Sequence, residues 1–375
     1  MALKTTETPA AASSSASTAE NSPGPLKTPP LLPISGCKPQ DPVPLTADEQ
    51  KKYDWLLAQA RGWKEVPSKV EGKSGPLTDD EKFWLSRECI IRFLRATKMH
   101  EKDSEKRLLE TLAWRREYGV DENLTPEHIS PENETGKQIM AGFDKQGRPC
   151  HYLNPARQNT DPSPRQIQHL VYMVERVLDL MPPHQETLTL LINFKPGKNR
   201  GNTAPGINIG RECLHILQMH YPERLGRALI INGKPYFHHL APYTDFFVND
   251  LTYHPTFAVP WVVWGFFKLI TPFIDPRTRE KLHFNEDMTQ FVPKEQLWTE
   301  YPGGEMAFEY EHETYWPALW KLCQERRAAR REKWVKGGKH IGEYEDFMTG
   351  YSERGCVTAA GLETKEEASK EETKT

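Results

Sequence analysis

The chain has 375 residues, of which 37% are hydrophobic and 27% charged, and its formal net charge at pH 7 is −3. This composition is enough for one large hydrophobic core or two smaller ones, and so small a net charge gives no reason to expect nucleic acid as a partner. The longest apolar run, residues 257–270, contains Pro260 and Lys268 and is shorter than the roughly 20 residues that a bilayer-spanning helix needs. We therefore expect a soluble globular protein without a transmembrane helix.

Residues 1–41 are rich in Ala, Ser, Thr and Pro and contain no apolar stretch of the kind found in a secretory signal. This composition is typical of a disordered arm. The six cysteines are scattered without a Cys-x-x-Cys pair, which argues against a zinc knuckle or a redox dithiol and fits a reducing cytosol. We expect neither a metal nor a cofactor.

Residues 42–120 predict a small helical domain. Thr46 and Thr78 have the pattern of N-caps, the second with a capping-box Glu three residues later. Residues 104–117 repeat apolar side chains at helical spacing, and the helix is expected to end before Gly119.

Beyond residue 120 the pattern changes to strands that alternate with helices, which predicts an α/β sheet. The expected elements are strands at 138–143 and 149–153, a helix from 164, a strand at 188–194, a helix at 207–220 and a strand at 228–232. A last helix is expected at 316–336, and an acidic, disordered tail at 358–375.

Two polar signatures stand out in this second half: the run from His220 to Gly226, and the run from Thr271 to Leu282. An aromatic segment, residues 261–270, lies between them and is too apolar for an ordinary exposed helix. Together they indicate a closed apolar cavity with a few charges that hold a head group.

With these signatures in this order, the chain resembles the CRAL-TRIO lipid-binding family, and within it the fungal phosphatidylinositol transfer proteins of the azole-tolerance subgroup. The resemblance covers residues 87–337 and is strongest at 93–98, 111–117 and 136–138. It implies an α/β fold with a mixed sheet flanked by helices, a hydrophobic pocket and a gate helix, preceded by a small all-α domain. The expected units are an arm at 1–41, the helical domain at 42–120, the lipid-binding domain at 121–312, a basic helix at 313–337 and a tail at 338–375.

The resemblance also implies that the inositol head group is held by Glu223, Thr278 and Lys281. A phosphodiester needs a cation and a hydroxyl donor, and inositol hydroxyls need an acceptor, so these residue types suit the ligand. A purely structural salt bridge is the alternative for the Glu and the Lys. The founding members of the family have an Arg where this chain has Thr97, so one phosphate-contacting cation is missing.

Members that bind phosphatidylcholine have two Tyr, a Ser and a Thr at the positions that correspond here to the pocket-wall residues Met140, His151, Leu188 and Leu190. Replacing hydrogen-bonding groups by apolar side chains costs roughly 1–3 kcal/mol for each partner lost by a buried phosphate. We therefore expect poor phosphatidylcholine binding and a sterol or another apolar lipid as second ligand. For His151, a pocket-wall or core role is favoured over catalysis.

The aromatic segment resembles the family's gate helix, with Trp261, Trp264, Phe266 and Phe267 as its large side chains. A two-tailed lipid has about 30 methylenes worth about 0.8 kcal/mol each, so a lid is required to keep it from water. An ordinary core helix is the alternative, because the aromatic residues lie on several faces.

Residues 233–258 have no counterpart in the family. The metal-site interpretation of their His and Asp residues is disfavoured by irregular spacing, and we interpret the segment as an insertion, with a translated intron as the hypothesis for its origin. The basic helix at 313–337 suits either an anionic membrane surface or packing on the domain. We thus expect a cytoplasmic carrier that associates peripherally with membranes or lipid droplets.

Two other classes of protein fit the sequence less well. An enzyme is disfavoured because the chain has neither a Walker-type loop nor a nucleophile elbow. A lipid-sensing signalling adaptor without net transfer is the second alternative, and a transfer assay between vesicles separates it from a carrier.

Overall fold

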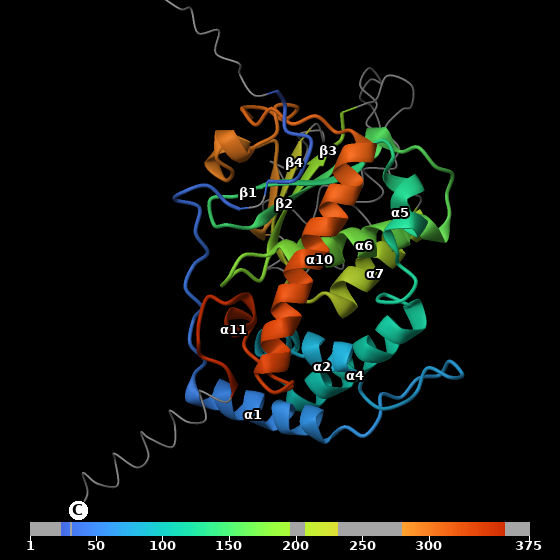
Figure 1. Cartoon of the computed structure of the whole chain (residues 1–375), viewed down its shortest axis with the longest axis vertical. Coiled ribbons are helices and arrows are strands. Elements are labelled where there is room, and N and C mark those ends of the chain that lie inside the picture. The colour runs from blue at the N-terminus through green and yellow to red at the C-terminus, as the bar shows by residue number, and fades with distance from the viewer. Residues whose placement is uncertain (1–23, 31, 196–206, 232–279, 357–375) are drawn as a thin grey trace, which may run out of the picture.

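The computed structural model describes residues 24–30, 32–195, 207–231 and 280–356, in two bodies joined by a long helix (Figure 1). The lower body consists of α1 (Ala47–Gly62), α2 (Asp79–Trp84), α3 (Arg87–Ala96) and α4 (Glu101–Tyr118). Thr46 and Thr78 each form a complete capping box, as the sequence predicts. The predicted third helix begins three residues earlier, at Glu101, and ends at Gly119 in a left-handed conformation.

The upper body contains a five-stranded sheet in the order β1-β2-β3-β4-β5. Its strands are β1 (Gln138–Phe143), β2 (Pro149–Leu153), β3 (Leu188–Asn193), β4 (Leu225–Ile231) and β5 (Leu282–Phe284). The β1–β2 pair is antiparallel and the other three pairs are parallel, which confirms the predicted mixed sheet. The register shifts within β1, where Gly142 has a positive φ.

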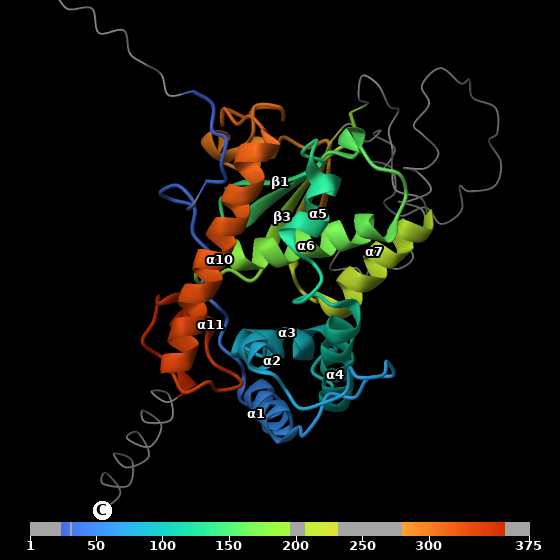
Figure 2. The same ribbon diagram turned by 45° about the vertical axis from the view of Figure 1, so that its right-hand side comes forward.

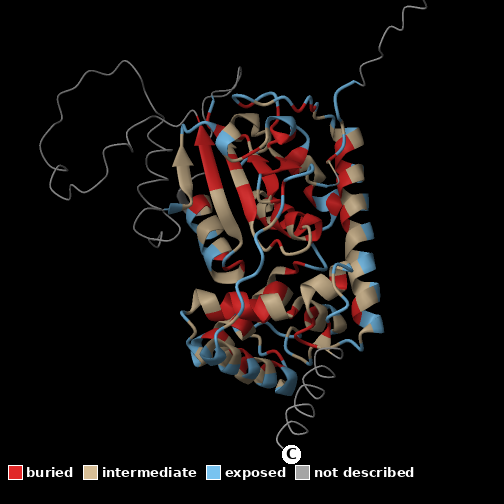
Figure 3. Ribbon diagram, turned by 90° about the vertical axis from the view of Figure 1, so that its left-hand side faces the viewer, coloured by how far each residue is buried: buried red, intermediate tan, exposed pale blue. Residues whose placement is uncertain are grey.

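Helices and short turns cover this sheet. The helices are α5 (Pro126–Asn133), α6 (Pro164–Leu180), α7 (Ile207–His220), α10 (His312–Lys336) and α11 (Glu345–Thr349), and the 3₁₀ turns are η1 (Pro155–Arg157), η4 (Met288–Gln290) and η5 (Lys294–Gln296). Figure 2 shows α5, α6 and α7 on one side of the sheet. The buried residues of the strands and of the helices that face them form the main core (Figure 3).

The two faces of the sheet contact different elements, because successive side chains of a strand point to opposite sides. His151 and Tyr152 are neighbours on β2, so their side chains point to opposite faces. His151 is linked through Gln138 to His169 of α6. The hydroxyl of Tyr152 accepts a hydrogen bond of 3.2 Å from the backbone N–H of Trp298, so the segment that follows η5 covers the face away from α6.

Part of the predicted arm is ordered on the upper body. The N–H of Leu26 donates to the carbonyl of Ala307 at 2.8 Å, and Cys37 is buried. The expectation of disorder for the whole of residues 1–41 therefore does not hold for the described part of that segment, because a strand-like contact with a distant segment supplies hydrogen bonds that local composition does not reveal.

Helix α10 runs from the sheet to the N-terminal helices (Figure 1). Two of its basic side chains reach carbonyls of the domain. Arg326 donates to the carbonyl of Leu180 at 2.9 Å, and Arg330 donates to those of Leu178 and Met181 at 3.2 and 2.6 Å. These carbonyls end α6, where they have no helical partner and where the helix dipole favours a cation. Of the two roles expected for this helix, packing on the domain is the one that the contacts support.

Candidate functional site

Glu223 and Lys281, two of the three predicted head-group residues, lie next to each other. Glu223 is in the turn between α7 and β4, and Lys281 precedes β5, which pairs with β4. Because neighbouring parallel strands begin at the same edge of the sheet, their preceding residues meet there. Lys281 Nζ lies 3.8 Å from Glu223 Oε2, and the two side chains are 27% and 39% exposed, so both remain accessible to a ligand.

Glu223 adopts φ of +58°, in the left-handed region that side chains other than glycine rarely occupy. Such a conformation costs about 1–3 kcal/mol and persists only where surrounding contacts impose it. The contacts that hold this turn in place are made by its neighbours His220 and Tyr221.

His220 and Tyr221 fix this turn to the N-terminal helices and to α6. The ring of His220 stacks on Trp114 of α4 with centroids 4.1 Å apart, and its Nδ1 lies 3.0 Å from the hydroxyl of Thr111. Burial lowers the pKa of His220 to about 3, so the ring is neutral at pH 7. The hydroxyl of Tyr221 donates to Glu175 at 2.6 Å.

Glu175 belongs to a buried ion-pair network under the turn. Arg115 donates to Glu175 at 2.7 Å and to Asp121 at 3.1 Å. Burial alone would raise the pKa of Glu175, but the charge of Arg115 outweighs it and holds that pKa below its ordinary value. The carboxylate therefore stays ionised and accepts the Tyr221 hydrogen bond.

Arg107 is a cation near this site that the sequence analysis did not single out. Thr97 stands where the family resemblance implies an Arg. Its hydroxyl donates to the carbonyls of Phe93 and Leu94 at 3.2 and 3.1 Å. Arg107 of α4 donates to the carbonyl of Met219 at 3.1 Å, close to the end of α7. Burial lowers the pKa of Arg107, and the charge of Glu223 opposes that shift.

A cavity of about 750 Å³ lies on the far side of the same turn, between the N-terminal helices and the end of α6. Arg92, Arg224 and Glu345 are among its lining residues. Arg92 is 4% exposed and pairs with Glu186 at 2.6 Å and with Glu345 at 3.2 Å. Such a polar wall is unsuited to acyl chains, so this cavity is not the expected lipid pocket.

The four residues predicted to form the pocket wall share one face of the sheet. Met140 pairs with His151 across β1 and β2, and His151 pairs with Leu190 across β2 and β3. Paired residues point to the same side, and Leu188 lies two residues before Leu190 on that side. Met140, His151 and Leu188 are buried, and Leu190 is half-buried. The wall is therefore contiguous and mostly apolar.

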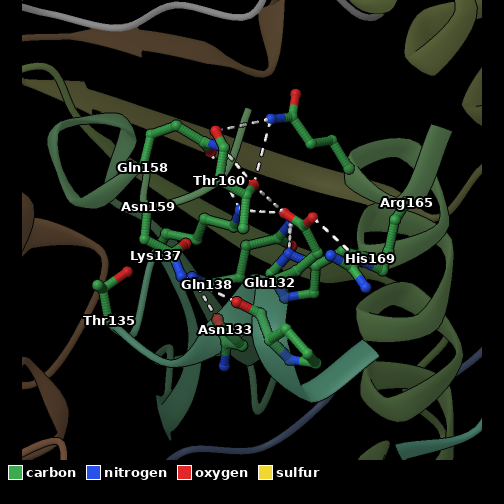
Figure 4. Close-up of polar contacts among 12 residues, drawn as sticks. Glu132, Asn133, Thr135, Lys137, Gln138, Gln158, Asn159, Thr160, Arg165 and His169 are labelled. Carbon is green, nitrogen blue, oxygen red and sulfur yellow. Dashed lines mark hydrogen bonds and ion pairs between the residues drawn. The ribbon is translucent and has the colours of Figure 1, made fainter. Parts of the chain in front are cut away.

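His151 is the only polar side chain among the four, and Gln138 links it to His169 of α6. Figure 4 shows Gln138 and His169. The side-chain oxygen of Gln138 lies 3.0 Å from His151 Nε2, and its side-chain nitrogen lies 3.2 Å from His169 Nδ1. The two imidazoles are 1% and 0% exposed. Sequence spacing gave no signal for this arrangement, because the three residues come from two strands and a helix.

Lys137, next to Gln138, is 7% exposed and belongs to a separate polar cluster (Figure 4). Its ammonium pairs with Glu132 and donates to Gln158 at 3.1 Å. Arg165 of α6 also donates to Glu132, at 3.2 Å. One carboxylate thus pairs with two cations, Lys137 and Arg165.

Several predicted features lie outside the described residues. They are Thr278, the gate residues Trp261, Trp264, Phe266 and Phe267, and the whole inserted segment 233–258. Within the described ranges, no helix combines the length and apolarity needed to cross a bilayer, and no group of three or more His, Cys, Asp or Glu side chains is arranged to hold a metal ion.

Two family models match this chain, one over the N-terminal helices and one over the sheet. The CRAL/TRIO domain matches residues 133–241 and 243–303, and the CRAL/TRIO N-terminal domain matches residues 52–110. The chain is 36% identical over 321 residues to the phosphatidylinositol transfer protein PDR17 of Saccharomyces cerevisiae, an alignment that covers 80% of this chain and 84% of that protein.

Two proteins of Schizosaccharomyces pombe are also similar. A CRAL-TRIO domain-containing protein is 49% identical over 310 residues, which are 82% of this chain but 28% of that longer protein. The Sec14 cytosolic factor is 26% identical over 212 residues, with 52% of this chain and 64% of that protein covered. Among solved structures, the crystal structure of Sfh5 is similar over 73% of this chain and 93% of that chain, with a TM-score of 0.47 and 16% identity.

Proposed function

Because the chain belongs to the CRAL-TRIO family, we propose that it binds phosphatidylinositol and carries it between membranes. The observation that supports this proposal most directly is the meeting of Glu223 and Lys281 at one edge of the sheet, 3.8 Å apart and partly exposed. An ammonium suits the phosphodiester and a carboxylate suits the inositol hydroxyls. Without a ligand the two charges neutralise each other.

Thr278 is assigned the third head-group contact in this proposal, as the hydroxyl donor to the phosphate. The gate residues are proposed to close the cavity over the acyl chains. Peripheral contact with a membrane is proposed for loading and release, and the cytoplasm is the proposed location.

The second ligand is proposed to be an apolar lipid such as a sterol rather than phosphatidylcholine. The contiguous wall of Met140, Leu188 and Leu190 supports this, because these side chains offer no hydrogen bond to a phosphate or an ester. A buried phosphate without partners is costly, whereas a hydrocarbon surface is accommodated by this wall.

A vesicle assay tests the carrier function. Fluorescent phosphatidylinositol moves from donor to acceptor vesicles in the presence of the wild-type chain, and Glu223→Ala with Lys281→Ala is expected to lower the rate at least tenfold. The matched control is Lys294→Ala with Glu305→Ala, which removes a pair that is also 3.8 Å apart and is 57% and 59% exposed.

Equal transfer by the first double variant and the wild type would show that the first pair is only a structural salt bridge. The same assay addresses the adaptor alternative. A chain that extracts phosphatidylinositol from vesicles but never delivers it would be a lipid sensor.

A further inference from the structure

The buried link of His151, Gln138 and His169 has a hydrogen-bonding capacity that the described residues leave unused. Burial lowers the pKa of His151 to about 4 and moves that of His169 well below its ordinary value, with Lys137 adding to the second shift. Both imidazoles are therefore neutral at pH 7, and each has one N–H and one lone pair.

The direction of the link follows from its contacts. The Nε2–H of His151 donates to the Gln138 oxygen, and the Gln138 amide donates to His169 Nδ1. This leaves the lone pair of His151 Nδ1 without a hydrogen-bond partner among the described residues. At the other end, His169 Nε2 is buried and also has no partner there.

His151 is the member of this link that lies in the pocket wall, between Met140 and Leu190 in the sheet register. A polar atom in an apolar wall that lacks a partner costs about 1–3 kcal/mol, so the wall favours a ligand that supplies one polar group at this point. A hydroxyl both donates and accepts, and it pairs with Nδ1 in either orientation of the Gln138 amide.

The charges near the link select against a phosphate. The ammonium that acts on His169 belongs to Lys137, and it is already paired with Glu132, a carboxylate that Arg165 also contacts. Neither imidazole is protonated at pH 7, so neither ring supplies a positive charge to an ionised head group. An ionised head group would remain uncompensated here, whereas a single uncharged hydroxyl would not.

We infer that His151 is the anchor for the hydroxyl of an otherwise apolar lipid of the sterol type, with Gln138 and His169 as residues that position its ring. This inference rests on the proposed lipid-carrier function and adds the group that the second ligand must present. It assigns the selectivity to one hydrogen bond rather than to the apolar wall alone.

The test compares a fluorescent sterol that has a free 3-hydroxyl with its 3-methyl ether. The wild-type chain is expected to bind the hydroxyl sterol roughly tenfold more tightly, and His151→Leu is expected to bind the two within a factor of about two. His128→Leu is the matched control: it removes an exposed imidazole that also contacts a glutamine side chain, with His128 Nε2 2.8 Å from Gln168 Oε1, and it should retain the preference.

A measurement on the wild-type chain keeps the test decisive if His151→Leu does not fold. The ¹⁵N chemical shift of His151 Nδ1 should move when the hydroxyl sterol is added and stay unchanged with the ether. A wild-type chain that transfers phosphatidylinositol but binds both sterols equally, or neither, overturns this inference alone. A chain that prefers the hydroxyl sterol but transfers no phosphatidylinositol supports the anchor and overturns the proposed carrier function.

Discussion

Replacing Glu223 by glycine should separate the contribution of this residue to stability from its contribution to lipid binding. Glycine adopts the observed φ of +58° without strain, so the substitution recovers about 1–2 kcal/mol. It loses a partly exposed ion pair worth about 0–1 kcal/mol and adds about 0.5–1 kcal/mol of unfolded-state entropy. The free energy of unfolding is therefore expected to change by no more than about 1 kcal/mol.

Binding should respond differently. A hydrogen bond to a charged group contributes about 1.5–3 kcal/mol, so loss of the Glu223 carboxylate is expected to weaken phosphatidylinositol binding by roughly 10-fold to 150-fold. Urea denaturation measures the first quantity and vesicle transfer the second. Glu223→Gln removes the charge but keeps the side chain, and it should lower transfer as well.

Lys339→Gly is the matched control. Lys339 also has a positive φ, of +59°, and also makes one partly exposed ion pair, with Asp79 at 2.7 Å. Its replacement is expected to have a similarly small effect on unfolding and no effect on transfer. A loss of more than about 3 kcal/mol for Glu223→Gly, or transfer within twofold of wild type, would refute the reasoning.

Three further outcomes are expected. Because the pKa of His151 in the folded state, about 4, lies below its ordinary value of 6.5, the unfolded state takes up a proton as pH falls through 6.5. His151 alone should lower stability by roughly 3 kcal/mol between pH 7 and 4, and His151→Leu should reduce the slope of the urea-denaturation profile by that share, while His169 and His220, whose pKa values are also lowered, keep the rest. Gly142→Ala should cost more than about 2 kcal/mol in the same assay, since a Cβ there would lie 2.1 Å from the carbonyl oxygen of Gln296 at a φ of +72°; an unchanged midpoint would contradict this. Leu188→Ser with Leu190→Thr should increase phosphatidylcholine co-purified with the chain, as measured by mass spectrometry, and no increase would count against the pocket-wall assignment.

The local signals in the sequence predicted most of the elements. The strands at 138–143 and 149–153 were predicted with the observed bounds, because a tight turn separates two short runs of strand-forming residues. Helix α5 was missed, although Thr125 caps it and Pro126 opens it in the usual pattern. Strand β5 was missed because three residues with a central His carry too little periodicity.

The site was predictable only in part. The resemblance to a known family indicated that Glu223 and Lys281 belong together, and the structure brings them within 3.8 Å. It gave no indication that Trp114 and Glu175 hold the turn that contains Glu223, because those residues lie in other helices, far away in the sequence. Such contacts depend on tertiary packing, which neither spacing nor composition encodes.

The inward arginines of α10 also bear on how long the protein stays on a bilayer. Arg326 and Arg330 donate to the carbonyls that end α6, and Arg327 pairs with Asp121. Guanidiniums committed in this way contribute little to adsorption on acidic phospholipids, for which each cation near the surface contributes about 1 kcal/mol. Residence on a membrane should therefore be brief and only weakly dependent on ionic strength, which suits the proposed carrier function.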